Sequence, residues 1–534
     1  MKKNIVIILF FAAYLILGLS IYKDYGACWD EIYQRDFGIK AYNYIVYGDN
    51  EYLTIINRFY GPVFQLLAVQ MEKTFHPQNL QDIYFLRHLL VFLVFYAGLI
   101  FFYLFLSKRF RDWRLALLGC FFMVLSPRLF GHTFYNPKDI PFLALFILCA
   151  YSFVLVLEKM TIPRILLLAV STALAISMRI LGVFVPAFVI FCAILYKFTD
   201  AKQKTSSNTR FFILLAAYVI FLTPLVVIFW PILWEAPLPR FMEALSNLKA
   251  LDWHKIPTLY MGRKILPSDV PWHYTPFWML ITIPVTYTVL FIAGIFVFLR
   301  NLLGRAIGRQ KEFIIDVFCF LWVFVPLVLP MFFHSPRFSS WRHHYFIYPA
   351  FLAIALSGLS ALRERIVAVN NLTKKKIILV AISLLIALDL GSVAGFMIRN
   401  HPYEDVYFNR LIGGIKGAEG KFEMDYWGIS YRRAFEYIAK TDKTPYIDIL
   451  AGNYSAKCNL FIVPFDVSTR FNVIVAATDP LTPKYTFHSG NAWLAKDAKY
   501  YVTDFYGTYD RLPFPLYYTV KVDGVSILDV YSAE

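Results

Sequence analysis

The chain has 534 residues, of which 59% are hydrophobic and only 16% are charged, and its mean hydropathy is +0.55. An average soluble domain has roughly 25% charged residues, so this composition excludes an ordinary soluble protein and a disordered one. Lys and Arg outnumber Asp and Glu by 52 to 36, a net charge of +16. In a soluble chain that excess would favour a nucleic-acid partner, but here the basic residues lie between apolar stretches. The sequence predicts a polytopic membrane protein that binds no nucleic acid.

Eleven apolar stretches follow one another along the chain. A transmembrane helix needs about 20 mostly apolar residues. The predicted spans are 4–22, 86–107, 115–127, 139–157, 165–178, 181–197, 211–230, 276–299, 313–333, 345–361 and 377–397. Polar residues interrupt 115–157 between Ser126 and Asp139, and Arg179 interrupts 165–197. Because each of these stretches is too long for one crossing, both are predicted to be hairpins whose polar tips line a wet cavity.

Basic residues mark one side of these spans. Lys and Arg accumulate on the cytoplasmic side of membrane proteins. In this chain they precede the first span at Lys2 and Lys3, and they fill alternate loops as far as Lys374–Lys376. The N-terminus is therefore predicted to be cytoplasmic. After eleven crossings, the C-terminus is predicted to be extracytoplasmic.

Three long segments are predicted on the outer side. Two are loops of a transmembrane region, 1–397, at 23–85 and 231–275; the third, 398–534, has the composition of a soluble domain. The first loop has an amphipathic pattern at Ile39–Tyr47 and Thr54–Phe75, typical of helices along a bilayer surface. In the third segment we expect one helix, several strands and a closing hairpin on Asp523-Gly524. These elements are Tyr431–Lys440 (helix), Tyr446–Leu450, Leu460–Pro464, Val473–Ala476, Tyr500–Asp504, Tyr517–Val522 and Val525–Val530. The predicted fold class is thus a polytopic helical membrane protein with a small α/β domain at its C-terminus.

Charged and polar side chains gather in the outer loops, against the inside bias of the basic residues. Adjacent carboxylates, Asp30 and Glu31, follow the first span. The later tips carry Arg128, His132, Asn136, Lys138, Asp139, Arg179, Arg337, Arg342, His343, His344 and Tyr345. Charge beside an apolar hairpin is costly without a partner or a function. The plainer alternatives are a solvated acidic loop and interfacial anchoring by long basic side chains.

These residue types suit one kind of chemistry. A carboxylate can take the proton from an acceptor hydroxyl as a general base. Cationic side chains can hold and stabilise a phosphate leaving group, and apolar spans can house a long lipid tail. Because an extracytoplasmic enzyme has no ready access to nucleotide sugars, a lipid phosphate in the membrane is a reasonable donor.

Metal and redox sites have weaker support. His343 and His344 are neighbours and would point apart on a helix, and neither an HExxH motif nor a CxxC pair is present. With Asp30, Glu31 and Asp139, a divalent cation stays open as a cofactor, although anion recognition by Arg and His is preferred and no metal ligand is assigned. Cys28 and Cys458, both predicted outside, leave a disulfide open as well.

The layout resembles the C-type (GT-C) fold of membrane glycosyltransferases, and in particular the bacterial relatives of protein O-mannosyltransferases and aminoarabinose transferases. The resemblance covers almost the whole chain. It is carried by Trp29-Asp30-Glu31, by Ser126-Pro127-Arg128 with Asn136–Phe142, by Arg179 with Gly182, by Pro271–Tyr274, and beyond 398 by His401–Glu404, Asn409, Gly413-Gly414 and Asp425–Ser430. Each motif alone is weak. Their order and their common side of the membrane make the match more specific.

The resemblance implies a glycosyltransferase in the inner membrane of a bacterium that uses a polyprenyl-phosphate sugar and an inverting single displacement. The acceptor is a hydroxyl of a protein, lipid or glycan. By this analogy Asp30 is the base with Glu31 beside it. Lys138, Arg179 and the Arg337–His344 group contact the donor phosphate, Asp139 positions an acceptor or a cation, and Trp427 belongs to an acceptor platform or to an ordinary core.

The main alternative is a transporter or flippase of a lipid-linked or anionic substrate. Such a protein would need polar residues well inside its spans. Only Asp389 lies there, while Asp316 lies near the inner end of its helix. A non-catalytic assembly or sensor protein is a second alternative, in which the outer domain binds a partner.

Overall fold

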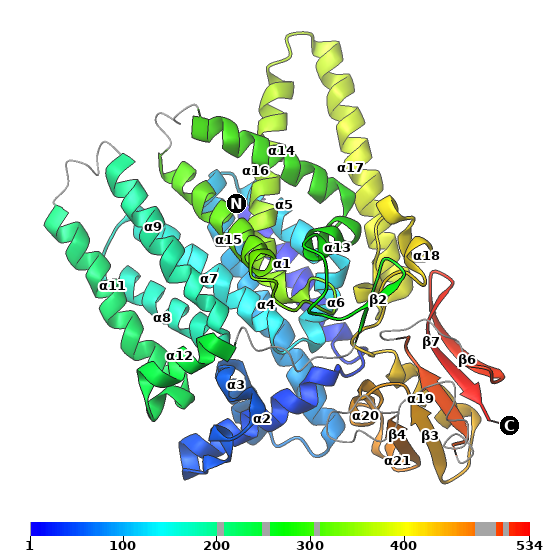
Figure 1. Cartoon of the computed structure of the whole chain (residues 1–534). Coiled ribbons are helices and arrows are strands. Elements are labelled where there is room, and N and C mark those ends of the chain that lie inside the picture. Colours follow the sequence, from blue (N-terminus) through cyan, green and yellow to red (C-terminus); the bar gives the residue numbers. More distant parts are fainter. Residues whose placement is uncertain are drawn as a thin grey trace.

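The computed structural model describes residues 2–199, 208–247, 257–303, 310–475, 498–505 and 512–533. Helices form a bundle, and a mixed β-sheet lies at one end of it (Figure 1). The helices of the bundle are α1 (Lys2–Ile21), α4 (Leu80–Phe110), α5 (Trp113–Val124), α6 (Pro127–Tyr135), α7 (Asp139–Glu158), α8 (Ile162–Met178), α9 (Phe184–Thr199), α11 (Asn208–Phe229), α13 (Tyr274–Thr282), α14 (Val285–Leu303), α15 (Gln310–Phe332), α16 (Tyr348–Val367) and α17 (Leu372–Asn400).

The helical spans occur where the sequence predicts them. Among the described residues, nine helices are long and apolar enough to cross a membrane, and the bent pair α5–α6 makes a tenth. The remaining predicted span corresponds to α8, which is apolar but only 17 residues long. A polytopic helical membrane protein is therefore confirmed.

Two predicted spans are bent or broken by proline. α5 and α6 meet at an angle of 72°, at Ser126-Pro127. The predicted span 276–299 is interrupted at Ile283-Pro284, where α13 ends and α14 begins. Proline lacks an N–H and disfavours helix at the residue before it, so a break at each position is expected. The first break turns α6 into the buried tip of the predicted hairpin.

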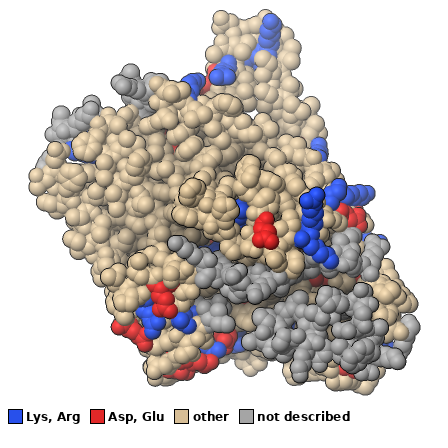
Figure 2. Space-filling model, viewed as in Figure 1, with Lys and Arg blue, Asp and Glu red and all other residues tan. Residues whose placement is uncertain are grey.

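The upper left part of the face seen in Figure 2 carries almost no charge, as a lipid-facing surface requires, whereas acidic and basic side chains lie at and right of the centre. The acidic residues within the spans have structural partners. Asp316 accepts two hydrogen bonds from Arg109 of α4, at 2.6 and 2.5 Å. Asp389 of α17 accepts the backbone N–H of Thr286 at 3.0 Å and so caps the start of α14. Neither carboxylate is left over for a transport pathway.

One end of the bundle, here called the site end, carries the short elements of the first and second predicted outer loops (Figure 1). They are α2 (Trp29–Tyr47), η1 (Asn50–Leu53), η2 (Ile56–Phe59), α3 (Val63–Phe75), η4 (Pro231–Trp234), α12 (Pro237–Asn247), β1 (Thr258–Tyr260) and β2 (Arg263–Ile265). The amphipathic stretch Thr54–Phe75 is not one helix, because Gly61-Pro62 separates η2 from α3. Residues 248–256 of the second loop lie outside the described residues.

The C-terminal region begins with short helical turns and continues into a sheet packed on α19. Its helical elements are η6 (Glu404–Val406), η7 (Arg410–Ile412), α18 (Gly414–Ala418), α19 (Tyr431–Thr441), α20 (Ser455–Leu460) and α21 (Phe465–Ser468). The strands are β3 (Ile447–Ala451), β4 (Phe471–Val475), β5 (Tyr500–Thr503), β6 (Leu516–Val522) and β7 (Val525–Ser532). Their order is β4-β3-β5-β7-β6, parallel among β4, β3 and β5 and antiparallel for β7 with β5 and β6.

Most of the predicted C-terminal elements are confirmed, including the helix at Tyr431 and the hairpin on Asp523-Gly524. Ala476 of one predicted strand lies outside the described residues. The strand predicted at Leu460–Pro464 is wrong: α20 ends at Leu460, and a turn follows. Ile462 and Val463 of that run are buried without any strand pairing. All six cysteines, including Cys28 and Cys458, are free thiols.

Candidate functional site

Asp30 lies in the first turn of α2, at the site end. The helix begins directly after Cys28 with a capping box, in which the Glu31 carboxylate accepts the backbone N–H of Cys28 at 2.9 Å. Asp30 is therefore fixed at a helix start, where the helix dipole favours a negative charge.

Glu31 has a different environment from its neighbour. Its side chain is buried, and besides capping α2 it lies 3.1 Å from Nε2 of His88 on α4. Both carboxylate oxygens are thus engaged in holding α2 to the bundle. This placement gives Glu31 a structural contact and turns it away from the solvent-accessible side of Asp30.

Asp139, at the start of α7, is the buried centre of an ion-pair cluster. Its carboxylate pairs with Arg179, from the junction of α8 and η3 (Ile180–Val183), and lies 3.4 Å from Nη1 of Arg342, the first residue of η5 (Arg342–Ile347). Asn136 donates to the same carboxylate at 3.0 Å. Two guanidinium groups and one amide therefore compensate the cost of burying this charge.

The turn between α6 and α7 is built by Asn136. Its side-chain oxygen accepts the backbone N–H groups of Lys138 and Asp139, at 3.2 and 2.9 Å. Such a local side-chain turn is typical of Asn. It fixes where the Lys138 and Asp139 side chains leave the backbone.

Asp30 and Lys138 form the accessible edge of the cluster. Oδ2 of Asp30 lies 3.5 Å from Nη1 of Arg342 and 3.6 Å from Nζ of Lys138. The side chains of Asp30 and Lys138 are 18% and 15% exposed, against 3% for Arg342 and 1% for Asp139. Three cations thus face two carboxylates, and the surplus positive charge lies next to the more exposed carboxylate. This edge can attract an anion.

His132 of α6 links this cluster to the C-terminal region. Its Nε2 receives the indole N–H of Trp427 at 3.2 Å and faces the hydroxyls of Tyr426 and Tyr345 at 3.1 and 3.4 Å. Its Nδ1 lies 3.0 Å from the amide nitrogen of Asn136. Because the Trp427 indole N–H can only donate, Nε2 accepts it and carries no proton, so the ring is neutral and is not a cation for phosphate.

Trp427 covers the inner side of the cluster. Arg342 stacks on its ring, 4.4 Å from the centroid, and Trp29 contacts it edge-on. Trp427 is fully buried, so it presents no exposed platform to an acceptor. It instead seals the cluster and stacks on a guanidinium, a contact that strengthens when desolvated.

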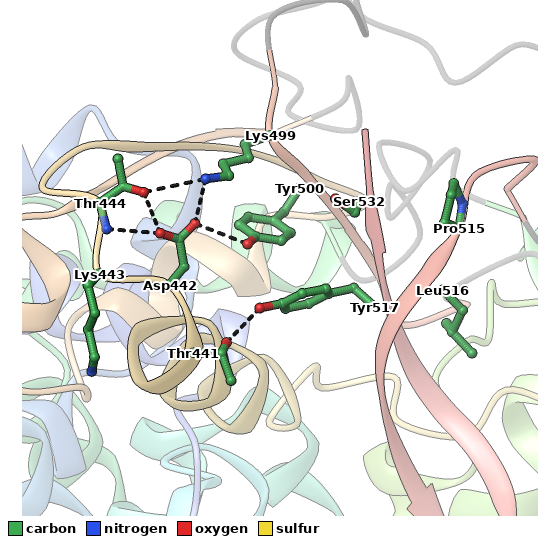
Figure 3. Close-up of a pocket in the computed structure, with 10 residues that line it drawn as sticks. All are labelled: Thr441, Asp442, Lys443, Thr444, Lys499, Tyr500, Pro515, Leu516, Tyr517 and Ser532. Carbon is green, nitrogen blue, oxygen red and sulfur yellow. Dashed lines mark hydrogen bonds and ion pairs between the residues drawn. The ribbon is translucent and has the colours of Figure 1, made fainter. Parts of the chain in front are cut away.

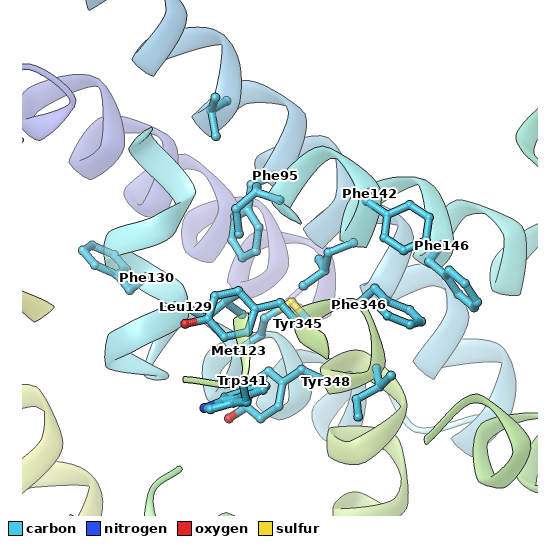
Figure 4. Close-up of a cluster of buried hydrophobic side chains, with 14 of the residues drawn as sticks. Phe95, Met123, Leu129, Phe130, Phe142, Phe146, Trp341, Tyr345, Phe346 and Tyr348 are labelled. Carbon is cyan, nitrogen blue, oxygen red and sulfur yellow. The ribbon is translucent and has the colours of Figure 1, made fainter. Parts of the chain in front are cut away.

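A packed aromatic core shares α7 and η5 with the cluster (Figure 4). It joins α4, α5, α6, α7 and η5 through buried side chains that include Phe95, Met123, Phe130, Phe142 and Phe346. Tyr345 belongs to this core, while its hydroxyl reaches His132. Close packing of this kind holds α7 and η5, and with them Asp139 and Arg342, in place.

Arg128 and Arg337 lie away from the Asp30–Asp139 cluster. Arg128 donates to the carbonyl of Tyr407 at 2.9 Å and lies over the rings of Trp278 and Phe408. Arg337 donates to the carbonyls of Trp272 and Val270 at 3.1 and 3.2 Å. Both therefore tie backbone segments together, while Nη1 and Nη2 of the buried Arg128 side chain have no hydrogen-bond partner among the described residues.

His343 and His344 are neighbours on η5. His343 packs edge-on against Phe338, with ring centroids 4.9 Å apart, and is half-buried, whereas His344 is buried. No set of three or more His, Cys, Asp or Glu side chains in the described parts of the chain could hold a metal ion. Because Arg342 bridges the two carboxylates of the cluster, these residues do not fit a divalent cation between them.

Sequence reasoning included Tyr426 in the possible acceptor platform around Trp427 but missed Tyr60. Tyr426, next to Trp427, shares the contact with His132, and Tyr60 lies with its ring centroid 4.6 Å from Nζ of Lys138. The residue after Tyr60, Gly61, has no room for a side chain, since an added Cβ would lie 1.0 Å from the carbonyl oxygen of Ser177. The loop that carries Tyr60 can therefore pack directly against the end of α8. The Gly61-Pro62 pair was the only local signal for this loop.

A cavity of about 680 Å³ lies in the C-terminal region, lined by Asp442, Lys499, Tyr500 and their neighbours (Figure 3). No residue of the Asp30–Asp139 cluster lines it. Burial alone would raise the pKa of Asp442, but hydrogen bonds from Thr444, Lys499 and Tyr500 hold this pKa below its usual value. The carboxylate is thus saturated by its own neighbours.

The sequence matches no protein-family model and no curated protein. Among solved structures, the chain is similar to ArnT from Cupriavidus metallidurans in the apo state, with a TM-score of 0.51 and 12% identity over 99% of this chain and 98% of that chain. The same protein bound to undecaprenyl phosphate gives a TM-score of 0.50 and 13% identity, over 99% and 98%. The oligosaccharyltransferase of Archaeoglobus fulgidus gives a TM-score of 0.46 and 12% identity over 84% of this chain. The match spans 62% of the length of that protein.

These neighbours are GT-C membrane glycosyltransferases. The likeness to ArnT extends over nearly all of both chains, at an identity that establishes the fold alone. The chain therefore has the GT-C fold, as its sequence motifs suggested. The Asp30–Asp139 cluster lies at the site end of that fold.

Proposed function

We propose that the chain is an integral-membrane glycosyltransferase that moves a sugar from a polyprenyl phosphate to an acceptor hydroxyl. One observation carries the proposal. The partly exposed carboxylate of Asp30 lies 3.5 and 3.6 Å from two cations of a cluster with surplus positive charge, at the site end of a GT-C fold. A base and a phosphate-binding surface therefore adjoin, as a displacement at a sugar phosphate needs. A similar structure, ArnT, holds undecaprenyl phosphate.

In this mechanism Asp30 takes the proton of the acceptor hydroxyl. The acceptor oxygen bonds to the anomeric carbon as the bond from that carbon to the phosphate oxygen breaks, and the electron pair leaves with the polyprenyl phosphate. A single displacement inverts the anomeric configuration. Lys138, the most accessible cation, meets the phosphate, while Arg179 and Arg342 behind it supply positive potential.

The remaining residues of the cluster orient these groups. Asp139 and Asn136 hold Arg179, Arg342 and the backbone of Lys138, and His132 joins the cluster to Trp427. Glu31 holds α2. We further propose that the site end faces the outside of the inner membrane, because the basic loops lie at the other ends of the spans.

The test uses purified protein in detergent with a panel of labelled polyprenyl-phosphate sugars. Release of polyprenyl phosphate is measured for the wild type, for Asp30→Asn and for Asp36→Asn. Asp36 is a matched control because it lies on the same helix and, among the described residues, forms its ion pair with Lys40 on the surface. Loss of a general base should slow turnover by roughly 100- to 10,000-fold, with lipid binding retained. Unchanged turnover in Asp30→Asn would remove Asp30 from the mechanism, and absent donor binding would favour a transporter.

A further inference from the structure

The two polypeptide segments that carry Asp30 and Trp427 meet at a buried side chain of the C-terminal region. This side chain is Asn459 of α20, which is fully buried. Its Oδ1 accepts the backbone N–H of Ala27 at 3.1 Å, and its Nδ2 donates to the carbonyl of Ala27 at 2.9 Å. The amide thus pairs with both backbone groups of a residue three positions before Asp30.

The same amide group also holds the segment of Trp427. Nδ2 lies 2.9 Å from the carbonyl oxygen of Gly428, the residue after Trp427, and 2.8 Å from that of Ser455. Two N–H bonds are therefore shared among three carbonyls, and every polar atom of the side chain is used. A buried amide with this many partners fixes the segments it joins, since each unmade bond would be costly.

Further contacts show that the two segments touch at this point. An added Cβ on Gly26 would lie 2.1 Å from the carbonyl oxygen of Ile429, so the two backbones are in direct contact. Arg432 of α19 donates to the carbonyl of Tyr25 at 2.9 Å. Beyond the contact, Trp29 meets Trp427 edge-on, and Trp427 stacks on Arg342.

We propose that Asn459 is a positioning residue, through which the C-terminal region sets the distance between Asp30 and the Trp427–Arg342 stack. Asn459 touches neither the reacting atoms nor the proposed phosphate ligands. Its effect on the reaction comes from the register of Ala27 against Gly428. This inference rests on the proposed function for its kinetic consequence, but the structural coupling can be tested without any substrate.

The test replaces Asn459→Asp, which keeps the size of the side chain but turns an oxygen toward three carbonyls. Asn472→Asp is the matched control, because Asn472 lies in the same C-terminal region, on β4, and bonds to Asp448 in an exposed place. In Asn459→Asp, backbone deuterium exchange should rise together in the peptides covering 26–31 and 427–430. The control should leave both unchanged. Exchange that stays low in either peptide would overturn the coupling.

The kinetic arm measures kcat and the affinity for polyprenyl phosphate separately. A misplacement of about 1 Å can cost roughly 100-fold in rate, so kcat should fall by that order in Asn459→Asp while the Kd for polyprenyl phosphate changes less than about twofold. A fall in affinity with unchanged kcat would contradict the proposal. If the wild type turns over no donor, the proposed function fails, and the exchange result still decides the coupling.

Gly26→Ala keeps the proposal falsifiable if Asn459→Asp does not fold. Its Cβ would lie 2.1 Å from the carbonyl oxygen of Ile429 and 2.5 Å from Oδ1 of Asn459, so it disturbs the same contact without removing the Asn459 amide. It should reproduce the paired rise in exchange and the loss in kcat. Exchange that rises in only one segment, or an unchanged kcat, would show that the register of Ala27 and Gly428 does not govern the site.

Discussion

Asp30 and Asp139 share one guanidinium. Nη1 of Arg342 lies 3.5 Å from Oδ2 of Asp30 and 3.4 Å from Oδ2 of Asp139, although the carboxylates come from different helices more than one hundred residues apart in sequence. The shared cation joins an accessible carboxylate to a buried one, and Trp427 covers its other face. Arg342 therefore connects the three parts of the site.

Replacing Arg342 with an uncharged residue should lower turnover more than replacing it with another cation. In Arg342→Gln the two carboxylates lose their common partner, and turnover should fall at least tenfold. Arg342→Lys keeps the charge but loses the planar stack on Trp427, so its turnover should lie between those of the wild type and of Arg342→Gln. The measurement is kcat with polyprenyl-phosphate sugar. Arg363→Gln, which alters an exposed pair with Asp112, is the control, and equal effects of the two Gln variants would contradict the role of Arg342.

The buried pair of Arg109 and Asp316, at the end of the bundle opposite the site, should matter for stability. Arg109→Gln leaves a largely buried carboxylate without its two hydrogen bonds, at a cost of about 3 kcal/mol. The double variant with Asp316→Asn should recover part of this loss. Unfolding in detergent measures both. Lys108→Gln, which removes an exposed pair with Glu158, should cost less than about 1 kcal/mol.

His401 should make stability depend on pH. Burial acts to lower the pKa of His401, but hydrogen bonds to Glu404 and Asp24, at 2.7 and 3.0 Å, raise this pKa above its usual value. A raised folded-state pKa gives stability that is fully present below the unfolded pKa of about 6.5 and lost as pH rises through the folded pKa. The melting temperature of His401→Gln should therefore fall below that of the wild type at acidic pH and approach it at alkaline pH. A deficit that grows with pH would refute this assignment.

Asp389 should be dispensable for turnover as long as it can accept a hydrogen bond. Asp389→Asn keeps an acceptor for the N–H of Thr286, whereas Asp389→Leu removes the cap of α14 and should cost about 1 kcal/mol of stability. Donor turnover should survive in Asp389→Asn. Abolished function in this variant, with normal stability, would point to a transport pathway through α17.

The sequence determined the membrane class and the order of spans, because long apolar runs and proline act locally. It also located nearly all the charged residues of the cluster, since charge near an apolar hairpin is costly wherever the hairpin lies. Local pattern failed at Leu460–Pro464, where Ile462 and Val463 are buried without strand pairing.

Only the tertiary structure decided which of these residues act together. Asp30 and Glu31 are adjacent in sequence, yet one faces the cations and the other is buried against His88. Arg128 and Arg342 look alike in sequence, but the first holds a backbone carbonyl and the second bridges two carboxylates. Asn459 carries no sequence signal at all, because its role depends on Ala27 and Gly428 meeting across the fold. Composition and periodicity record what each segment prefers, whereas a site depends on distances between segments, which packing alone fixes.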